Sequence, residues 1–364
     1  MIRSETIPGS RNKRYLAEDV RALRGGKGTA ALSAADAPAS PIFDSAITLI
    51  ADGAFYYRGV PVQQLAQSAT LEEVASLLWA MTDDPFRRET DPYPNLPNPG
   101  DDLDIAERMM ALLPLAQAKD PAAFTMTPAA LARTGARIVV LLAQIAAARS
   151  WSNLPIHKML ATSWTKDRPH AEHLIRAALV VLADHEFNAS TFTMRCVIST
   201  RPPIHSAVAA ALASLRGPRH GGMVAQVEAI LDDIADDTPA RAMEALRRRM
   251  KRGDRLFGFG HPLYPEGDPR ASILVKMMRD SAPREPRLAQ GLAFISAAEE
   301  ITGEKPNIDV AVAILCRHLG LRPGMGFALF AVARTVGWIA HAIEQIGRPE
   351  LIRPRARYIG PPPA

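Results

Sequence analysis

From residue 70 to residue 346 the sequence repeats one pattern, in which apolar residues three and four positions apart alternate with breaks at proline or glycine. That spacing places the apolar side chains on one face of an α-helix. In LEEVASLLWAMT, a threonine N-cap at Thr70 and early glutamates add helix-start signals. We therefore expect an all-α protein. The pattern recurs at 103–118, 128–148, 171–183, 190–199, 203–214, 222–235, 238–251, 271–281, 287–301, 308–319 and 324–346.

Strand signals occur only between Ile42 and Val62. There the segment AITLIADGAFYYRGVPV has β-type runs on both sides of Asp52 and Gly53, a pair that favours a tight turn. We expect one small β-hairpin near the N-terminal end of the helical body.

Residues 1–41 differ in composition from the rest. The first part is basic, and residues 25–41 are small and polar without periodicity, which is typical of a linker. The basic part, with a short helix expected from Ala17 to Leu23, resembles the wing and following helix of a MerR-type domain whose recognition helices are missing. A basic tail with one or two helical turns is an equal alternative. Without a helix-turn-helix, nothing would enter a DNA major groove.

The bulk composition indicates an ordinary globular protein with 48% hydrophobic and 22% charged residues. At 364 residues, two domains are expected. The net charge of +5 is compatible with a multiply anionic ligand and is weak evidence for nucleic acid.

Two cysteines without disulfide or metal-ligand spacing indicate a reducing compartment. The N-terminus has no apolar core of a signal peptide. The apolar stretch from Ile138 to Ala148 is too short to span a bilayer. We therefore expect a cytoplasmic protein with no membrane partner.

Four loops carry polar residues that the helical body lacks. Three of them place a histidine beside turn residues, and the fourth places Asp309 at a helix start. Each has an ordinary explanation as a turn or a cap. Together they favour a functional site. The loops are ADHEFNASTF (183–192), SLRGPRHGGM (214–223), GFGHPLYPEGDPR (258–270) and KPNIDVAVAIL (305–315).

These loops lack the sequence signatures of three common types of site. His185-Glu186 has no second histidine four residues on, so the HExxH zinc pattern is absent, although the spacing leaves a three-histidine site open. No GxSxG nucleophile elbow occurs. The glycines at 258 and 260 do not continue into a GxGxxG dinucleotide fingerprint.

The four loops, in this order, resemble the signature segments of the citrate synthase family, which includes citrate and 2-methylcitrate synthases. DSAITLIADGAFYYRGVPVQQLA resembles the family's N-terminal hairpin, and ARTVGWIAHAIEQ with IRPRARYIG resembles its C-terminal helix and tail. The similarity covers about residues 43 to 360. It implies a mostly helical homodimer. Each subunit would have a large domain (42–222 and 320–364), a small domain (223–319) and an active site between them.

The resemblance also implies a reaction. Family members condense an acyl-CoA, usually acetyl-CoA, with oxaloacetate and hydrolyse the thioester, as in the tricarboxylic acid cycle. The acyl-CoA is a cosubstrate, and no permanently bound cofactor or metal is expected. Propionyl-CoA, giving 2-methylcitrate, is the alternative substrate. An alternative of another class is a non-catalytic metabolite sensor or DNA-linked regulator, although nucleic acid is not expected as a partner.

Site residues follow from the resemblance, motif by motif. Asp309 would be the base that removes a proton from the acyl carbon, His220 would hydrogen-bond the thioester oxygen, and His261 would donate to the keto oxygen of oxaloacetate. Three groups of the same chain and one from the partner subunit would bind the dicarboxylate. These four are His185, Arg270, Arg334 and, across the interface, Arg353.

Elementary chemistry fits these roles. An enolate needs a base and a donor aimed at the developing oxyanion. A helix N-terminus after His220 would keep its imidazole neutral. Two carboxylates call for several guanidinium groups, because arginine binds a carboxylate with two parallel hydrogen bonds. Gly221 and Gly222 would leave room for the thioester, and Gly258 and Gly260 would let the backbone approach the substrate.

One position departs from the family pattern. Many relatives carry a basic residue just after the histidine of the third loop, where it helps to hold the CoA phosphates, whereas Pro262 and Pro265 stand here. The basic run at the end of the preceding helix could take over that role, with a solvated helix face as the alternative. The candidates are Arg249, Lys251 and Arg252.

Overall fold

The computed structural model describes residues 4–6, 13–15, 43–87, 92–100, 102–150, 152–166, 168, 170–234, 239–282 and 284–361. The chain divides into two compact units, Met1–Ser45 and Ala46–Ala364. The second unit contains all the helices described below.

The first unit contains a short antiparallel pair of strands, β1 (Ser4–Thr6) and β2 (Lys13–Tyr15). The sequence predicted no strand here, so the expectation of a single strand region was incomplete. The short helix expected from Ala17 to Leu23 lies outside the described residues. The MerR-like interpretation stays a prediction.

The predicted hairpin is confirmed at the start of the second unit. Strands β3 (Thr48–Ala51), β4 (Ala54–Tyr57) and β5 (Val60–Pro61) form an antiparallel sheet in that order. Asp52 and Gly53 both have positive φ angles, 52° and 71°, as a primed hairpin turn requires.

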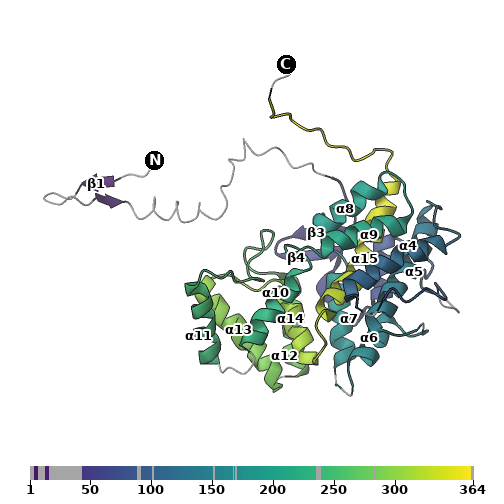
Figure 1. Ribbon diagram of the computed structural model, residues 1–364. Helices are drawn as coiled ribbons and strands as arrows, with labels where there is room; N and C mark the ends of the chain where they lie inside the picture. The colour runs from purple at the N-terminus through teal and green to yellow at the C-terminus, as the bar shows by residue number, and fades with distance from the viewer. Residues whose placement is uncertain are drawn as a thin grey trace. The chain divides into compact units, whose positions relative to one another are not determined.

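All the other regular elements of the second unit are helices (Figure 1). The prediction of an all-α protein with one small hairpin in the body is therefore confirmed. Two helices, α2 and α6, were not predicted. The helices are α2 (Val62–Ser68), α3 (Leu71–Trp79), α4 (Ile105–Ala118), α5 (Pro128–Ala147), α6 (Ile156–Trp164), α7 (Ala171–Leu182), α8 (Ala189–Ile198), α9 (Ile204–Leu215), α10 (Met223–Asp233), α11 (Pro239–Lys251), α12 (Pro269–Ser281), α13 (Pro286–Thr302), α14 (Ile308–Leu319) and α15 (Met325–Ile346).

Helix α15 lies at the centre of the core, where α3, α5, α7, α8 and α9 pack around it. The indole N–H of Trp79 on α3 donates to the carbonyl of Val336 at 2.8 Å. Gly337 lies directly against the chain after α7, since a Cβ added there would lie 2.4 Å from the carbonyl oxygen of Ala183. Glycine is therefore required for this close approach.

Helices α5 and α15 are long and apolar enough to cross a bilayer by length and composition alone. The stretch from Ile138 to Ala148, expected to be too short to span a bilayer, thus belongs to a 20-residue helix that ends at Ala147, with Ala148 as its C-cap. In each helix most of the apolar window is buried in the protein, 72% for α5 and 89% for α15. Burial of this extent is typical of core helices.

Helices α10 to α14 pack mainly on one another, α11 on α13 and both α10 and α12 on α14 (Figure 1). They correspond to the predicted small domain, 223–319. Because Ala46–Ala364 forms one compact unit, the division into a large and a small domain stays a prediction.

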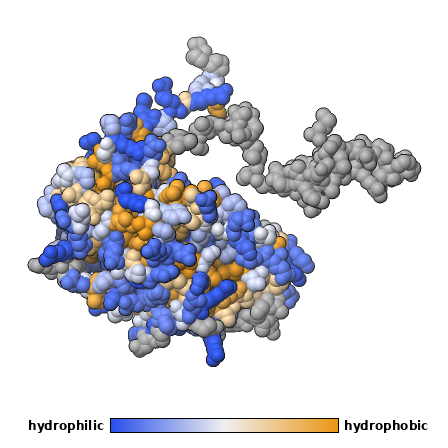
Figure 2. Space-filling model, turned by 180° about the vertical axis from the view of Figure 1, so that it is seen from behind, coloured by the Kyte–Doolittle hydropathy of each residue, from blue (hydrophilic) through white to orange (hydrophobic). Residues whose placement is uncertain are grey.

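After α15 the chain continues in an extended course to residue 361 and ends away from the helices (Figure 1). Figure 2 shows hydrophilic residues along this segment. Three arginines of this tail, Arg353, Arg355 and Arg357, are exposed. The tail therefore offers cationic side chains at some distance from the core.

Candidate active site

A cavity of about 360 Å³ collects residues from all four polar loops. It is bounded by the loop before α8, the turn before α10, the loop before α12, and parts of α12, α14 and α15. Six of the seven predicted catalytic and substrate-binding residues line it. They are His185, His220, His261, Arg270, Asp309 and Arg334.

His185 is buried between α7 and α8, and its Nε2 lies 2.9 Å from the hydroxyl oxygen of Tyr264. Its ring stands perpendicular to the ring of His261, with centroids 5.3 Å apart. Burial, followed by the neighbouring charges of Arg270 and Arg334, holds the pKa of His185 well below its usual value. The ring is therefore neutral and can serve as a donor or an acceptor.

His220 ends the turn before α10. Its Nε2 lies 2.8 Å from Ser190 Oγ, which also accepts a hydrogen bond from the indole of Trp338 at 3.2 Å. Burial lowers the pKa of His220 to about 4, and Arg334 and Arg270 add to the effect. The one hydroxyl hydrogen of Ser190 lies within reach of both Asn188 Oδ1, at 2.8 Å, and His220 Nε2. When it goes to Nε2, the neutral ring carries its hydrogen on Nδ1, free for a ligand.

His261 has its tautomer set by the backbone. The amide of Leu263 donates to His261 Nδ1 at 3.2 Å, so the hydrogen of the neutral ring lies on Nε2. Burial, together with Arg270, lowers the pKa of His261. The loop is held by hydrogen bonds from the Tyr264 amide to the His261 carbonyl and from the Gly267 amide to the Tyr264 carbonyl. His261 thus presents one Nε2–H donor in a braced loop.

Asp309 lies in the first turn of α14, but it is not the N-cap. Asn307 has that role, and its Oδ1 accepts from the Asp309 amide at 3.0 Å. The Asp309 carboxylate makes no hydrogen bond to the residues described. Burial raises its pKa to about 7, and Asp268 adds to this while Arg270 and Arg334 oppose it. A carboxylate with this pKa is suited to act as a base near neutral pH.

Arg270 begins α12 and is already paired. Its Nε and Nη2 donate to the two carboxylate oxygens of Asp268 at 2.9 and 2.7 Å, and both side chains are buried. Asp268 also caps the helix. Its charge holds the guanidinium in place and leaves Nη1 without a partner among the residues described. One face of the Arg270 fork can therefore bind an anion.

Arg334 comes from the middle of α15 and is buried. Its Nε donates to the carbonyl of Leu182 at 2.9 Å, while its two Nη groups make no hydrogen bond to the described residues. Burial lowers the pKa of Arg334, and the nearby Asp184 carboxylate opposes that effect. These free donors face the same cavity as Arg270.

Behind Arg334 lies a buried polar network that the sequence did not predict. Asp184 accepts from Thr48 Oγ1 at 2.6 Å and lies 3.3 Å from His341 Nε2. Arg195 donates to His341 Nδ1 and pairs with Glu344. Because this network joins α8 and α15 directly beside His185, it fixes the rear wall of the cavity.

The sequence indicated that glycines in the polar loops leave room for the substrate. In the structure, some of them have a second role, which is to allow close backbone packing. A Cβ on Gly221 would lie 2.7 Å from Leu215, and one on Gly222 would lie 2.6 Å from the carbonyl of Arg216. These glycines allow the tight turn itself. Gly258 has a φ of 87° and faces Val310, so it permits the loop to pass close to α14.

Four predicted residues lie outside the cavity. Arg353 is exposed in the C-terminal tail. Arg249 pairs with Asp233, Arg252 pairs with Asp254 at 2.8 Å, and Lys251 is exposed. Within this one chain, none of the four reaches the site.

Several residues in the cavity wall or directly behind it were not singled out from the sequence. Tyr264 and Ser190 lie behind the wall, where they contact the predicted histidines, and both stand inside the quoted motifs. Arg219 and Arg255 are exposed cations on the cavity wall. Their positions beside His220 and ahead of Gly258 were the only signal in the sequence. Although three histidines converge here, the described part of the chain holds no cluster of three His, Cys, Asp or Glu side chains arranged for a metal ion.

The arrangement has a definite chemical capacity. Two buried guanidinium groups can hold a small dianion, and neutral imidazoles can donate to carbonyl oxygens. A carboxylate with a raised pKa can remove a proton from carbon next to a carbonyl. The cavity can therefore bind a dicarboxylate and stabilise an enolate.

Comparison with known proteins points the same way. Residues 39–355 match the family described as "Citrate synthase, C-terminal domain". The chain is 29% identical over 349 residues to citrate synthase 2 of Bacillus subtilis, which covers 87% of this chain and 93% of that protein. It is 37% identical over 187 residues to 2-methylcitrate synthase 1 of Corynebacterium glutamicum, a match that spans 50% of this chain and 48% of that one.

A solved structure shows the same fold. Citrate synthase of Thermoplasma acidophilum, in a ternary complex with carboxymethyl coenzyme A and oxaloacetate, superimposes with a TM-score of 0.74 at 24% identity. The superposition covers 90% of this chain and 96% of that one.

Proposed function

Because the chain belongs to the citrate synthase family and is an enzyme of that type, we propose that it condenses acetyl-CoA with oxaloacetate and hydrolyses the product thioester to citrate and CoA. One observation carries the proposal. A carboxylate with a pKa of about 7, three neutral histidines and two buried arginines line a single cavity.

Oxaloacetate would bind first at the rear of the cavity. Its two carboxylates would accept from Arg270 Nη1 and from the free Nη groups of Arg334. Its keto oxygen would accept from His261 Nε2–H, with His185 beside it. These neutral donors polarise the keto carbon without adding a charge that would have to be neutralised.

The acyl-CoA thioester would then lie between Asp309 and His220. Asp309 takes a proton from the methyl carbon while His220 Nδ1–H donates to the thioester oxygen, which becomes the enolate oxygen. The enolate carbon attacks the keto carbon of oxaloacetate, and the new alkoxide takes the Nε2 proton of His261. His261 regains a proton through water from the protonated Asp309, so that both groups return to their starting states. Water then cleaves the thioester, giving citrate and CoA.

The CoA phosphates need cations outside the catalytic centre. We assign this role first to Arg219 and Arg255, because both are exposed on the wall of the cavity. Arg249, Lys251 and Arg252 remain candidates for phosphates beyond the cavity. Two of these three residues already form ion pairs, Arg249 with Asp233 and Arg252 with Asp254.

The choice of acyl chain is the remaining alternative. Curated relatives carry both names, citrate synthase and 2-methylcitrate synthase. One additional methylene changes discrimination by about 1–3 kcal/mol. We propose acetyl-CoA as the preferred substrate. Side-by-side kcat/KM values for acetyl-CoA and propionyl-CoA test this, and a higher value for propionyl-CoA would assign the enzyme to 2-methylcitrate synthesis.

Assembly and location are part of the same proposal. Oxaloacetate would be held by Arg353 from the partner subunit of a homodimer, which accounts for an exposed arginine in an extended tail. The enzyme would act in the cytoplasm, in the tricarboxylic acid cycle. Family membership favours an enzyme over the non-catalytic regulator.

The identity of the product tests the proposal. Acetyl-CoA labelled with ¹³C in its methyl group and unlabelled oxaloacetate should give citrate with one ¹³C methylene, detected by mass spectrometry. Unlabelled citrate, or labelled acetate as the only product, would contradict a condensation.

A further inference from the structure

Tyr264 lies behind the wall of the catalytic cavity and touches two of its histidines. It belongs to the loop before α12, and only 3% of its surface is exposed. Its hydroxyl oxygen lies 2.9 Å from His185 Nε2, and the two ring centroids are 5.6 Å apart. The ring of Tyr264 also packs on that of His261, with centroids 5.0 Å apart. One side chain thus contacts both histidines proposed to hold oxaloacetate.

The direction of the hydrogen bond between Tyr264 and His185 follows from the partners of the hydroxyl. Burial raises the pKa of Tyr264, so the phenol keeps its single hydrogen at neutral pH. Within the described part of the chain, His185 Nε2 is the one hydrogen-bond partner of this hydroxyl. If His185 donated, the phenol hydrogen would stay buried without an acceptor, which costs free energy. Tyr264 is therefore the donor, and His185 Nε2 accepts.

This direction sets the tautomer of His185. Burial, with the charges of Arg270 and Arg334, lowers the pKa of His185, so the ring is neutral and carries one hydrogen. Because Nε2 accepts, that hydrogen lies on Nδ1. Nδ1 bonds to none of the described residues, and it stays accessible at the cavity wall that His185 lines. His185 therefore offers an Nδ1–H donor to a ligand.

The same loop sets the tautomer of His261. The amide of Leu263 donates to His261 Nδ1 at 3.2 Å, which leaves the hydrogen on Nε2. The amide of Tyr264 donates to the carbonyl of His261 at 3.0 Å, so the phenol is held at a fixed place relative to that ring. The rings of His185 and His261 stand perpendicular to each other. Two donors on different ring edges can bind two different oxygens of one small ligand.

From these contacts we propose that Tyr264 is a positioning residue, which holds His185 in its Nδ1–H form so that His185 donates to oxaloacetate beside His261. Without the phenol hydrogen, the neutral ring of His185 is free to carry its hydrogen on Nε2. Nδ1 would then turn a lone pair toward an anionic ligand and repel it. The effect on oxaloacetate rests on the proposed function, whereas the tautomer itself does not.

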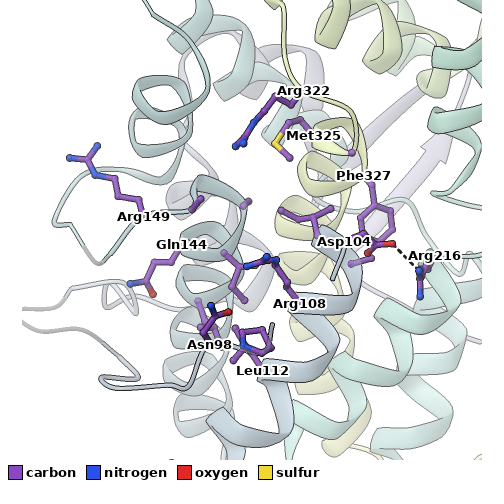
Figure 3. Close-up of a pocket in the computed structure, with 18 of the residues that line it drawn as sticks. Asn98, Asp104, Arg108, Leu112, Gln144, Arg149, Arg216, Arg322, Met325 and Phe327 are labelled. Carbon is purple, nitrogen blue, oxygen red and sulfur yellow. Dashed lines mark hydrogen bonds and ion pairs between the residues drawn. The ribbon is translucent and has the colours of Figure 1, made fainter. Parts of the chain in front are cut away.

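The chain contains a second buried pair of the same kind, which serves as a matched control. The hydroxyl oxygen of Tyr93 lies 2.8 Å from His205 Nε2, and both residues are buried. Tyr93 lines a different cavity, of about 1100 Å³, with Leu112 and Gln144 on its wall (Figure 3). Among the described residues, that wall contains none of the proposed catalytic or substrate-binding residues. Loss of the Tyr93 hydroxyl therefore breaks a similar bond outside the site.

Nuclear magnetic resonance of the wild type, with ¹⁵N-labelled histidine and no substrate, tests the tautomer directly. The His185 signals are identified by their loss in His185→Ala. We expect the ring hydrogen of His185 on Nδ1 in the wild type, and a substantial share on Nε2 in Tyr264→Phe. A wild-type His185 with its hydrogen on Nε2 would overturn the proposal, whatever the activity. This measurement does not depend on the folding of the Tyr264 variant.

Oxaloacetate affinity and turnover test the consequence. Tyr264→Phe keeps the ring and removes one oxygen. It should raise the KM and the calorimetric Kd for oxaloacetate about tenfold, because a hydrogen bond to the anion is lost. It should lower kcat at saturating oxaloacetate by less than about threefold, because His220 and Asp309 are unchanged. Unchanged affinity in Tyr264→Phe would show that the proposal is wrong.

Tyr93→Phe should leave KM and kcat within about twofold of the wild type, because this residue is distant from the catalytic groups. If both tyrosine variants weakened oxaloacetate binding equally, the effect would be a general loss of stability, and the specific role of Tyr264 would be refuted.

A double-mutant cycle shows whether Tyr264 acts through His185. In a His185→Ala background, Tyr264→Phe should change the Kd for oxaloacetate by less than about twofold. A further tenfold loss there would mean that Tyr264 acts by another route, contrary to the proposal. A wild type that shows the Nδ1–H form of His185 but binds no oxaloacetate would refute the proposed function and leave the bond between Tyr264 and His185 as assigned.

Discussion

At the scale of single residues, the chemistry of the cavity depends on which groups carry protons. Burial keeps His220 neutral and at the same time raises the pKa of Asp309 to about 7. One environment thus prepares both a neutral donor and a base, since desolvation always opposes the charged form.

The pH dependence of kcat/KM for acetyl-CoA reports on Asp309. The base must be ionised, and its raised pKa means that the carboxylate form is lost as the pH falls through about 7. We expect kcat/KM to fall about tenfold per pH unit below that value. His220, with a pKa of about 4, contributes nothing in this range. A profile that is flat between pH 5.5 and 8 would show that Asp309 is not the base.

Ser190 should matter through the tautomer of His220. The Ser190→Ala variant loses the oxygen that lies 2.8 Å from His220 Nε2, so that this partner no longer fixes the tautomer and orientation of the ring. We expect kcat to fall about tenfold to a hundredfold, with little change in the KM for oxaloacetate. Thr193→Ala, which removes a hydroxyl that binds only the Ala189 carbonyl of the same helix, is the matched control. An equal loss in both variants would indicate damage to α8 instead.

At the scale of elements, the position of α15 determines where the polar groups of the cavity lie. This helix carries Arg334 and lies directly against the segment before His185. Gly337 makes that contact possible. Its amide donates to the Ala183 carbonyl at 3.0 Å, and an added Cβ would lie 2.4 Å from Asp184 Oδ1. The position of Arg334 and His185, the two residues proposed to bind substrate on either side of this contact, thus depends on one missing side chain.

Gly337→Ala should therefore destabilise the protein by about 1–3 kcal/mol through overpacking, and it should lower activity as well. The measurement is the melting temperature, which should fall by several degrees. Gly347→Ala is the control, because Gly347 has no positive φ and its nearest contact is the Glu344 carbonyl at 3.5 Å. Equal melting temperatures for Gly337→Ala and the wild type would mean that α15 can shift without cost.

Comparison of elements also shows what the sequence could predict. Helices such as α3 and α14 have clear periods and caps, and their predicted starts were correct within a residue or two. Helices α2 and α6 are short and follow Pro61 and Pro155 without a side-chain cap, so that no signal marked their start.

The site was predictable only in part. His185, His220 and Asp309 stand in recognisable motifs. Arg219 stands in one of these motifs and Arg255 stands just ahead of another, but only the fold shows that they line the cavity. The contacts of Asp184 were not predictable, because they join segments more than 130 residues apart.

At the scale of the whole molecule, the proposed site is incomplete in one chain. Arg270 and Arg334 line the cavity, whereas Arg353 is exposed on an extended tail. Two subunits that exchange tails would complete the site.

Subunit mixing tests this arrangement. Arg353→Ala and Arg270→Ala should each lower activity by about tenfold or more, since each removes a charged hydrogen bond to a carboxylate. Mixed dimers would contain one site with both arginines intact, so mixing the two inactive variants after reversible dissociation should restore up to a quarter of wild-type activity. No recovery in mixtures proven to contain hybrid dimers would argue for self-contained subunits.

The most direct measurement for the whole proposal is the release of free CoA thiol from acetyl-CoA, with and without oxaloacetate, by the wild type and by Asp309→Asn. We predict rapid release by the wild type only when oxaloacetate is present. Release by Asp309→Asn should be about a thousandfold slower, while oxaloacetate still binds, as calorimetry would show. Thiol release that is independent of oxaloacetate, or equally fast in Asp309→Asn, would contradict a condensation at this cavity.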